Sequence, residues 1–223
     1  MTQLLNDDGS ASMATALLMS HHAFRRDVAR LGVALRGATS IDPAKVSGLQ
    51  EAWTFLRNAL HGHHTVEDTS MFPGMRAQHP ELGPVFDRLA AEHHRIDPLL
   101  EAGDRAFADL AKAPAPAAAV TAELAALLDQ HLTFEEANVV QFIREAKSFP
   151  PPGNDAEAEM YATGFAWSSH GIAPDVLAKV DEMLPASLTT RLAAARVAYD
   201  QQCARVWGAG PAGASRTSIP QLG

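Results

Sequence analysis

Apolar side chains recur at spacings of three and four residues through the first two thirds of this chain, and this rhythm limits its fold more than any other feature. Such a stripe covers one face of an α-helix, and that face must be buried against other helices. We predict four long helices, over residues 12–37, 44–71, 82–112 and 116–146. Short connections separate them, including a predicted break at Phe72-Pro73-Gly74, so consecutive helices should run antiparallel. The predicted fold class is therefore all-α, an antiparallel up-down-up-down four-helix bundle.

A proline cluster ends the bundle in the sequence. The run Phe149-Pro150-Pro151-Pro152-Gly153 cannot be helical, because proline lacks a backbone N–H and clashes with the preceding turn. Two or three shorter helices are predicted after it, over residues 155–168, 173–183 and 185–207. We therefore divide the chain into the bundle at residues 1–148, a C-terminal helical extension packed on it at 149–208, and a flexible tail at 209–223.

Charge and cysteine content exclude several classes of partner and site. The 223-residue chain has a formal net charge of −8 and no cluster of lysine and arginine, which argues against nucleic acid and anionic membranes. Cys203 is the only cysteine, so there is no internal disulfide or thiolate metal cluster, and a reducing compartment is indicated. The apolar run Met13–Met19 is too short to span a bilayer. We expect a cytoplasmic protein whose partner is a small molecule or another protein.

Ionisable residues continue the inward stripes of all four predicted helices. Four of them are histidines and two are glutamates, and each glutamate lies four residues after a histidine. On a helix, positions four apart share one face about a turn apart. With a rise of about 1.5 Å per residue, all six positions fall at roughly one depth of an up-down bundle. They are His21, His63, Glu67, His93, His131 and Glu135.

This convergence indicates a shared cation. A buried ionisable side chain without a partner costs about a few kcal/mol, so six of them would cancel a typical net stability of about 5–15 kcal/mol. Four imidazoles and two carboxylates exceed the needs of one tetrahedral zinc ion and suit two octahedral ions with bridging carboxylates. Iron fits these donors best, ahead of manganese and zinc. We expect the adjacent His22, His64 and His94 at helix seams or in solvent, and expect loss of His64 to leave the metal in place.

Four ordered motifs resemble those of a known family. They are HHAFRRDVARL, HHTVEDTSMFP, AEHHRIDPLL and HLTFEEANVV, within about residues 14 to 146. Together they resemble the hemerythrin-like family, in its bacterial HHE cation-binding branch with a C-terminal helical extension. The resemblance implies a non-haem di-iron centre in which Glu67 and Glu135 bridge two iron ions, themselves joined by an oxo or hydroxo group. The terminal ligands would be His21, His63, His93 and His131.

Two further positions bear on whether the second iron is complete. Oxygen-carrying hemerythrins have a second histidine four residues after the one on the third helix, and this chain has Asp97 there. The iron nearest that helix is then one ligand short, or it takes Asp97 or water. His170 lies on a predicted turn in GFAWSSHGIAPD and is a further candidate ligand or gate.

The resemblance implies an open iron position for O2, nitric oxide or peroxide, and three classes of function follow from it. The first, which we expect, is binding or sensing of the small molecule, with a protein partner or a homodimer receiving the change. The second is an enzyme that consumes peroxide or nitric oxide. The third is a structural or iron-responsive regulatory role. A ferritin-like di-iron site is excluded, because no glutamate in the chain has a histidine three residues later.

Overall fold

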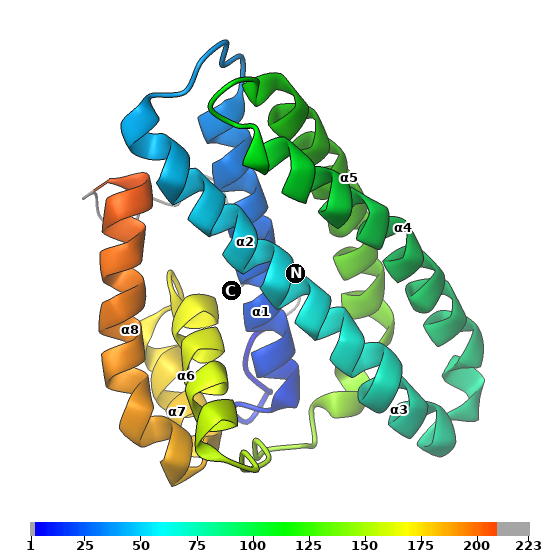
Figure 1. Ribbon diagram of the computed structural model, residues 1–223. Helices are drawn as coiled ribbons and strands as arrows, with labels where there is room; N and C mark the ends of the chain where they lie inside the picture. The colour runs from blue at the N-terminus through cyan, green and yellow to red at the C-terminus, as the bar shows by residue number, and fades with distance from the viewer. Residues whose placement is uncertain (1–2, 209–223) are drawn as a thin grey trace. The chain divides into compact units, whose positions relative to one another are not determined.

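The computed structural model describes residues 3–208, and these residues are helical with no β-strand among them. The predicted all-α fold class is confirmed. The helices in chain order are α1 (Met13–Leu35), α2 (Pro43–Val66), α3 (Phe72–Gln78), α4 (Gly83–Ala108), α5 (Pro114–Asn138), α6 (Asp155–Ser169), α7 (Pro174–Met183) and α8 (Ala186–Trp207) (Figure 1). Within residues 3–208, no helix combines the length and the apolar character that a membrane span needs.

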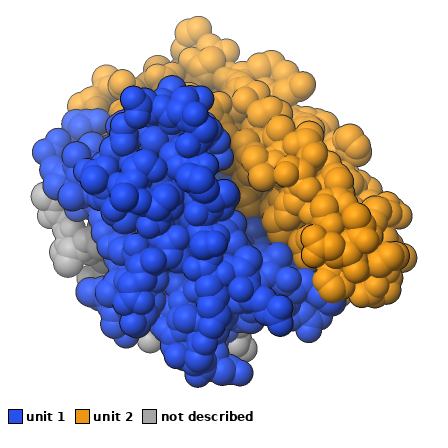
Figure 2. Space-filling model, turned by 90° about the horizontal axis from the view of Figure 1, so that it is seen from below, with its two compact units in different colours: residues 1–26, 139–223 blue, residues 27–138 orange. Residues whose placement is uncertain are grey.

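The chain forms two compact units (Figure 2). Unit 1 comprises residues 1–26 and 139–223, and unit 2 comprises residues 27–138. Helix α1 therefore contributes residues to both. We predicted a different division, at residue 148, and that domain boundary stays a prediction. The predicted flexible tail at 209–223 lies outside the described residues.

Unit 2 holds the end of α1 together with α2, α3, α4 and α5, and α4 and α5 lie side by side (Figure 1). Its core is built where α2 meets α4. The Trp53 ring stacks on the Phe107 ring with centroids 4.7 Å apart, and its indole N–H donates to Asp104 at 2.9 Å. The α-carbon of Gly103 faces the same indole so closely that an added Cβ would overlap it. Close contact at Gly103 thus fixes α2 against α4, the two helices that carry His63, His64 and His93.

The second helix does not end where the sequence predicted. Instead of a break at Phe72-Pro73-Gly74, α2 passes into a π-helical turn over Glu67–Met71, and α3 continues to Gln78. The Phe72 N–H bonds to the carbonyl of Glu67, five residues back. Pro73 follows directly after this wider turn, in the first turn of α3, and the wider spacing makes room for its ring. The expectation of a break was wrong because it assumed uniform α-helical spacing.

The fourth predicted helix ends earlier than residue 146. Helix α5 stops at Asn138, and a 3-10 turn follows over Val140–Ile143. The side chain of Asn138, the last residue of α5, donates to the Phe134 carbonyl at 2.7 Å.

Unit 1 is organised around a buried arginine. Its C-terminal helices α6, α7 and α8 match the predicted ranges within one residue, and α6 packs along α8. Arg26 Nη1 donates to the carbonyls of Trp167 and His170, at 3.1 and 2.8 Å, while Nη2 donates to the Tyr199 hydroxyl at 3.0 Å. These bonds tie the first part of α1 to the end of α6 and to α8.

Candidate metal centre

Unit 2 brings together a first donor group of three histidines and one glutamate. One ligand atom from each residue lies within 4.8 Å of the others, and all four side chains are buried. They come from α2, the π-helical turn, α4 and α5, so residues far apart in the sequence converge at one level. The first donor group is His64, Glu67, His93 and His131.

A second donor group shares one residue with the first. It consists, within unit 2, of His63, Glu67 and Glu135, whose ligand atoms also lie within 4.8 Å of one another. Glu67 Oε1 is 2.8 Å from His63 Nε2, whereas Glu67 Oε2 is 3.5 Å from His93 Nε2. The two oxygens of one carboxylate therefore face two different sets of donors. The Glu67 carboxylate therefore lies between the two donor groups.

Carboxylates hold the outer nitrogens of two histidines in the first donor group. The Nδ1–H of His93 donates to Asp68 Oδ2 at 2.9 Å, and the Nδ1–H of His131 donates to Glu92 Oε2 at 3.0 Å. Burial favours a higher pKa for Glu92, but hydrogen bonds from Arg88 and His131 outweigh it and hold the pKa below its usual value. Because carboxylates accept, each imidazole carries its proton on Nδ1, as metal-bound histidines usually do.

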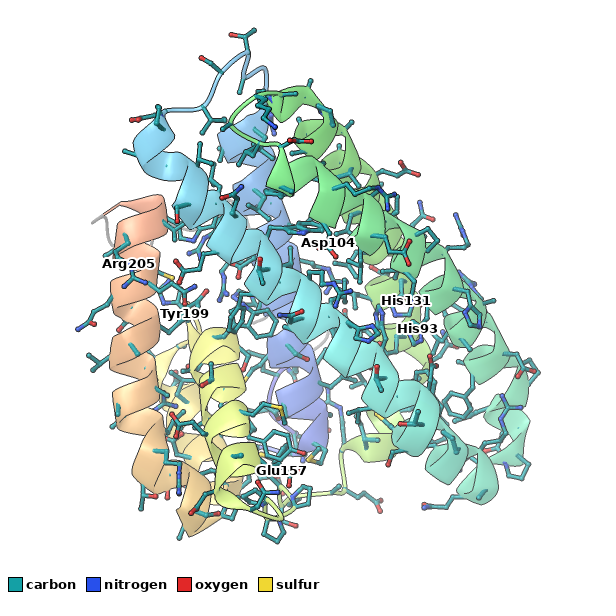
Figure 3. The ribbon with its side chains drawn as sticks, in the orientation of Figure 1. His93, Asp104, His131, Glu157, Tyr199 and Arg205 are labelled. Atoms are coloured by element: carbon teal, nitrogen blue, oxygen red, sulfur yellow. The ribbon has the colours of Figure 1, made fainter. Side chains whose placement is uncertain are left out.

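The inner nitrogens of the same two histidines face each other, and Figure 3 shows the two rings side by side. His93 Nε2 and His131 Nε2 are 3.3 Å apart. Burial lowers the pKa of His93 and favours its neutral ring, although the neighbouring Asp68 opposes the shift. Two neutral rings protonated at Nδ1 point two lone pairs at one place, which is unfavourable unless a cation lies between them. The donor set therefore fits a metal ion.

Aromatic rings cover one side of this donor group. Phe72 stacks on Phe86 with centroids 4.9 Å apart, and its ring is 6.0 Å from that of His93. Phe72 is the first residue of α3, so the π-helical turn that precedes it sets the position of this cover. A ring at this place limits the access of water to His93 and raises the strength of electrostatic interactions there.

The predicted ligands are divided between the two units of the chain. Unit 2 brings together five of them, which are His63, Glu67, His93, His131 and Glu135. His21 is buried on α1 in unit 1, and its assignment stays a prediction. Asp97, the residue proposed to complete the second iron, is exposed on α4 and belongs to neither donor group. A role of Asp97 as a ligand stays a prediction.

His170 is held by its neighbours in unit 1. It ends α6, its Nδ1 is 3.2 Å from Asp200 Oδ1, and its ring lies edge-on to Tyr199 with centroids 5.4 Å apart. Its carbonyl accepts from Arg26, as described above. The expected turn between two C-terminal helices is confirmed, while a role of His170 as ligand or gate stays a prediction.

His64 is the donor that the sequence argument placed wrongly. It was expected at a helix seam or in solvent, but it is buried, with 3% of its surface exposed, and belongs to the first donor group. Leu60 is buried on the same face, and a helical face about 100° wide accepts residues at both i+3 and i+4. His63 and His64 are these two positions. The width of the apolar stripe is the feature that could have found His64.

The sequence argument also missed Glu92, the carboxylate that accepts from His131. Glu92 immediately precedes His93 in the sequence and pairs with His131 on another helix. No spacing within one helix marks such a contact, because it depends on how α4 and α5 pack.

Comparison with protein families agrees with this donor set. The family model described as the hemerythrin HHE cation-binding domain matches residues 12–143, which is more than half of the 223-residue chain. No curated protein and no solved structure matches the chain. The matched range includes every residue of both donor groups, and the family is one that binds metal ions. The chain belongs to the hemerythrin HHE cation-binding domain family.

Proposed function

We propose that this chain is a non-haem di-iron protein that binds or senses a small molecule, either O2, nitric oxide or peroxide. The observation that carries the proposal is the position of Glu67, whose two carboxylate oxygens face His63 and His93 separately. A single mononuclear site would not need a carboxylate shared between two donor groups. Glu135, the other glutamate at a donor group, is the proposed second bridge.

The choice of iron follows from the chemistry of the donors. All are imidazole nitrogens or carboxylate oxygens, and thiolates are absent from the chain apart from Cys203. This mixture suits octahedral ions that keep an exchangeable position. We assign His63 and the buried His21 as terminal ligands of one iron, and His93 and His131 as terminal ligands of the other. When bound, the iron supplies the open position and the redox chemistry that a diatomic or peroxide ligand requires.

The protein side chains orient the donors and control access. Asp68 and Glu92 fix the Nδ1 protons of His93 and His131, which leaves the Nε2 lone pairs directed inward. The Phe72 ring covers one side of His93 and limits water there. A dry, prearranged set of donors favours reversible binding, because fewer water molecules and protons reach the bound ligand.

A second candidate function is supported by Asp68. An enzyme that consumes peroxide or nitric oxide needs a group that moves protons between the site and solvent. The Asp68 side chain is 36% exposed and contacts buried His93, so it connects the donor group with the surface. We rank this activity below binding, because the same contact also serves to orient the histidine.

The visible spectrum of the reduced protein separates these functions. Purified protein is loaded anaerobically with Fe(II), exposed to air and then returned to low oxygen. Reversible binding predicts an absorption band that appears and disappears over repeated cycles. An enzyme predicts sustained consumption of added peroxide or nitric oxide that Asp68→Asn slows without changing bound iron. A protein purified with zinc that gives no band after iron loading contradicts both functions and leaves the structural or regulatory role.

A further inference from the structure

We propose that His64 is a metal ligand, and that it takes the coordination place for which Asp97 is the sequence candidate. The inference rests on the proposed di-iron function and names a donor beyond the six that the sequence pattern assigned.

The surroundings of His64 are those of a donor rather than of a seam residue. Its side chain is buried, and one of its ring nitrogens lies within 4.8 Å of ligand atoms of Glu67, His93 and His131. Its ring is 3.9 Å from the His93 ring at an interplanar angle of 17°, and 5.3 Å from the His131 ring at 78°. Three imidazoles thus gather around the Glu67 carboxylate.

Asp97 cannot serve the same ion in this arrangement. It lies one turn after His93 on α4 but is exposed, whereas His93 points into the unit and is only 2% exposed. Helix α4 therefore contributes one buried histidine, and α2 contributes two on adjacent positions. His63 Nε2 lies at Glu67 Oε1, whereas His64 belongs to the donor group of His93, whose Nε2 is 3.5 Å from Glu67 Oε2. Adjacent histidines on α2 would thus serve different ions.

Two substitutions at position 64 separate ligation from ring packing. His64→Phe keeps an aromatic ring against His93 and removes the donor nitrogens, whereas His64→Glu removes the ring and supplies a carboxylate oxygen. His61→Ala is the matched control, since His61 is an exposed histidine three residues earlier on α2. Each protein is titrated anaerobically with Co(II) and with Fe(II), and bound metal and the cobalt visible spectrum are measured. Far-UV circular dichroism and melting of the metal-free proteins check folding, and His64→Leu replaces His64→Phe if the latter does not fold.

If His64 is a ligand, His64→Phe should bind one of the two ions as tightly as the unaltered protein does. It should bind the other ion more than about 100-fold more weakly, a larger loss than removing an outer hydrogen-bond partner usually causes. The cobalt spectrum should also change, and His64→Glu should recover the second ion. His61→Ala should match the unaltered protein. Full metal content and an unchanged cobalt spectrum in His64→Phe would overturn the inference while leaving the di-iron proposal intact. An unaltered protein that binds only one ion refutes the proposed function itself, so the two failures are distinguishable.

Discussion

Replacing Gly103 with alanine should destabilise the protein, although alanine is the better helix former. Gly103 lies inside α4 and faces the indole ring of buried Trp53. A Cβ at this position would overlap Cζ2 and Cη2 of Trp53 and lie 2.7 Å from Cε2. The indole cannot move away without cost, because it stacks on Phe107 and donates to Asp104.

The expected loss of stability is the sum of one stabilising and two destabilising contributions. Gly→Ala inside a helix gains about 1 kcal/mol of helix propensity. Displacing the indole weakens its hydrogen bond to the half-exposed Asp104, at about 1 kcal/mol, which offsets that gain. Overpacking of a core costs about 1–3 kcal/mol, and this contribution remains. We therefore expect Gly103→Ala to lower the free energy of unfolding by about 1–3 kcal/mol.

Urea unfolding of the metal-free protein, followed by circular dichroism, measures this loss directly. Gly62→Ala is the control, because Gly62 is exposed inside α2 and an added Cβ meets nothing within 4 Å, so stability should rise by about 1 kcal/mol. In a Trp53→Phe background the clashing indole atoms are gone, and Gly103→Ala should no longer be destabilising. If Gly103→Ala raises stability as much as Gly62→Ala does, the close approach of α2 and α4 is refuted.

Three further predictions concern the donors. Glu67→Ala should lower bound iron from about two ions per chain towards none, because both donor groups share this carboxylate. Elemental analysis measures the bound iron, which should be unchanged in the control Glu101→Ala. Retained iron in Glu67→Ala would contradict bridging. Asp68→Ala should weaken metal binding by about 10–100-fold, measured by chelator competition, and an unchanged affinity would rule out orientation of His93 by Asp68. Burial lowers the pKa of His93 in the folded protein, so on acidification the unfolded chain takes up a proton on this imidazole at a higher pH than the folded protein does. The stability of the metal-free protein should therefore fall as the pH decreases below 6.5, the ordinary pKa of a histidine. Urea unfolding from pH 8 to pH 5 tests this, and stability that stays level or increases on acidification would contradict it.

The helical period predicted much of this fold, because burying one face of a helix imposes a repeat that a sequence displays directly. It placed α1 and selected His63, His93 and His131 as inward residues. It failed at Pro73, where a π-helical turn changes the hydrogen-bond spacing from four to five residues. The apolar period and the helix-breaking residues do not distinguish such a turn from a helix end.

The candidate site shows a second limit of single-helix patterns. His64 was misplaced because the stripe was treated as one residue wide, although i+3 and i+4 positions after Leu60 share the buried face. The contact between Glu92 and His131 depends on the packing of α4 against α5. Such contacts join residues on different helices, so periodicity along one helix cannot predict them.

The most direct test of the di-iron account is the number and type of metal ions bound by the unaltered chain. Protein loaded anaerobically with Fe(II) and freed of excess metal is measured by elemental analysis and Mössbauer spectroscopy. The shared position of Glu67 predicts about two iron ions per chain, giving two distinguishable iron environments. One iron per chain in a single environment, or no iron retained, would contradict it.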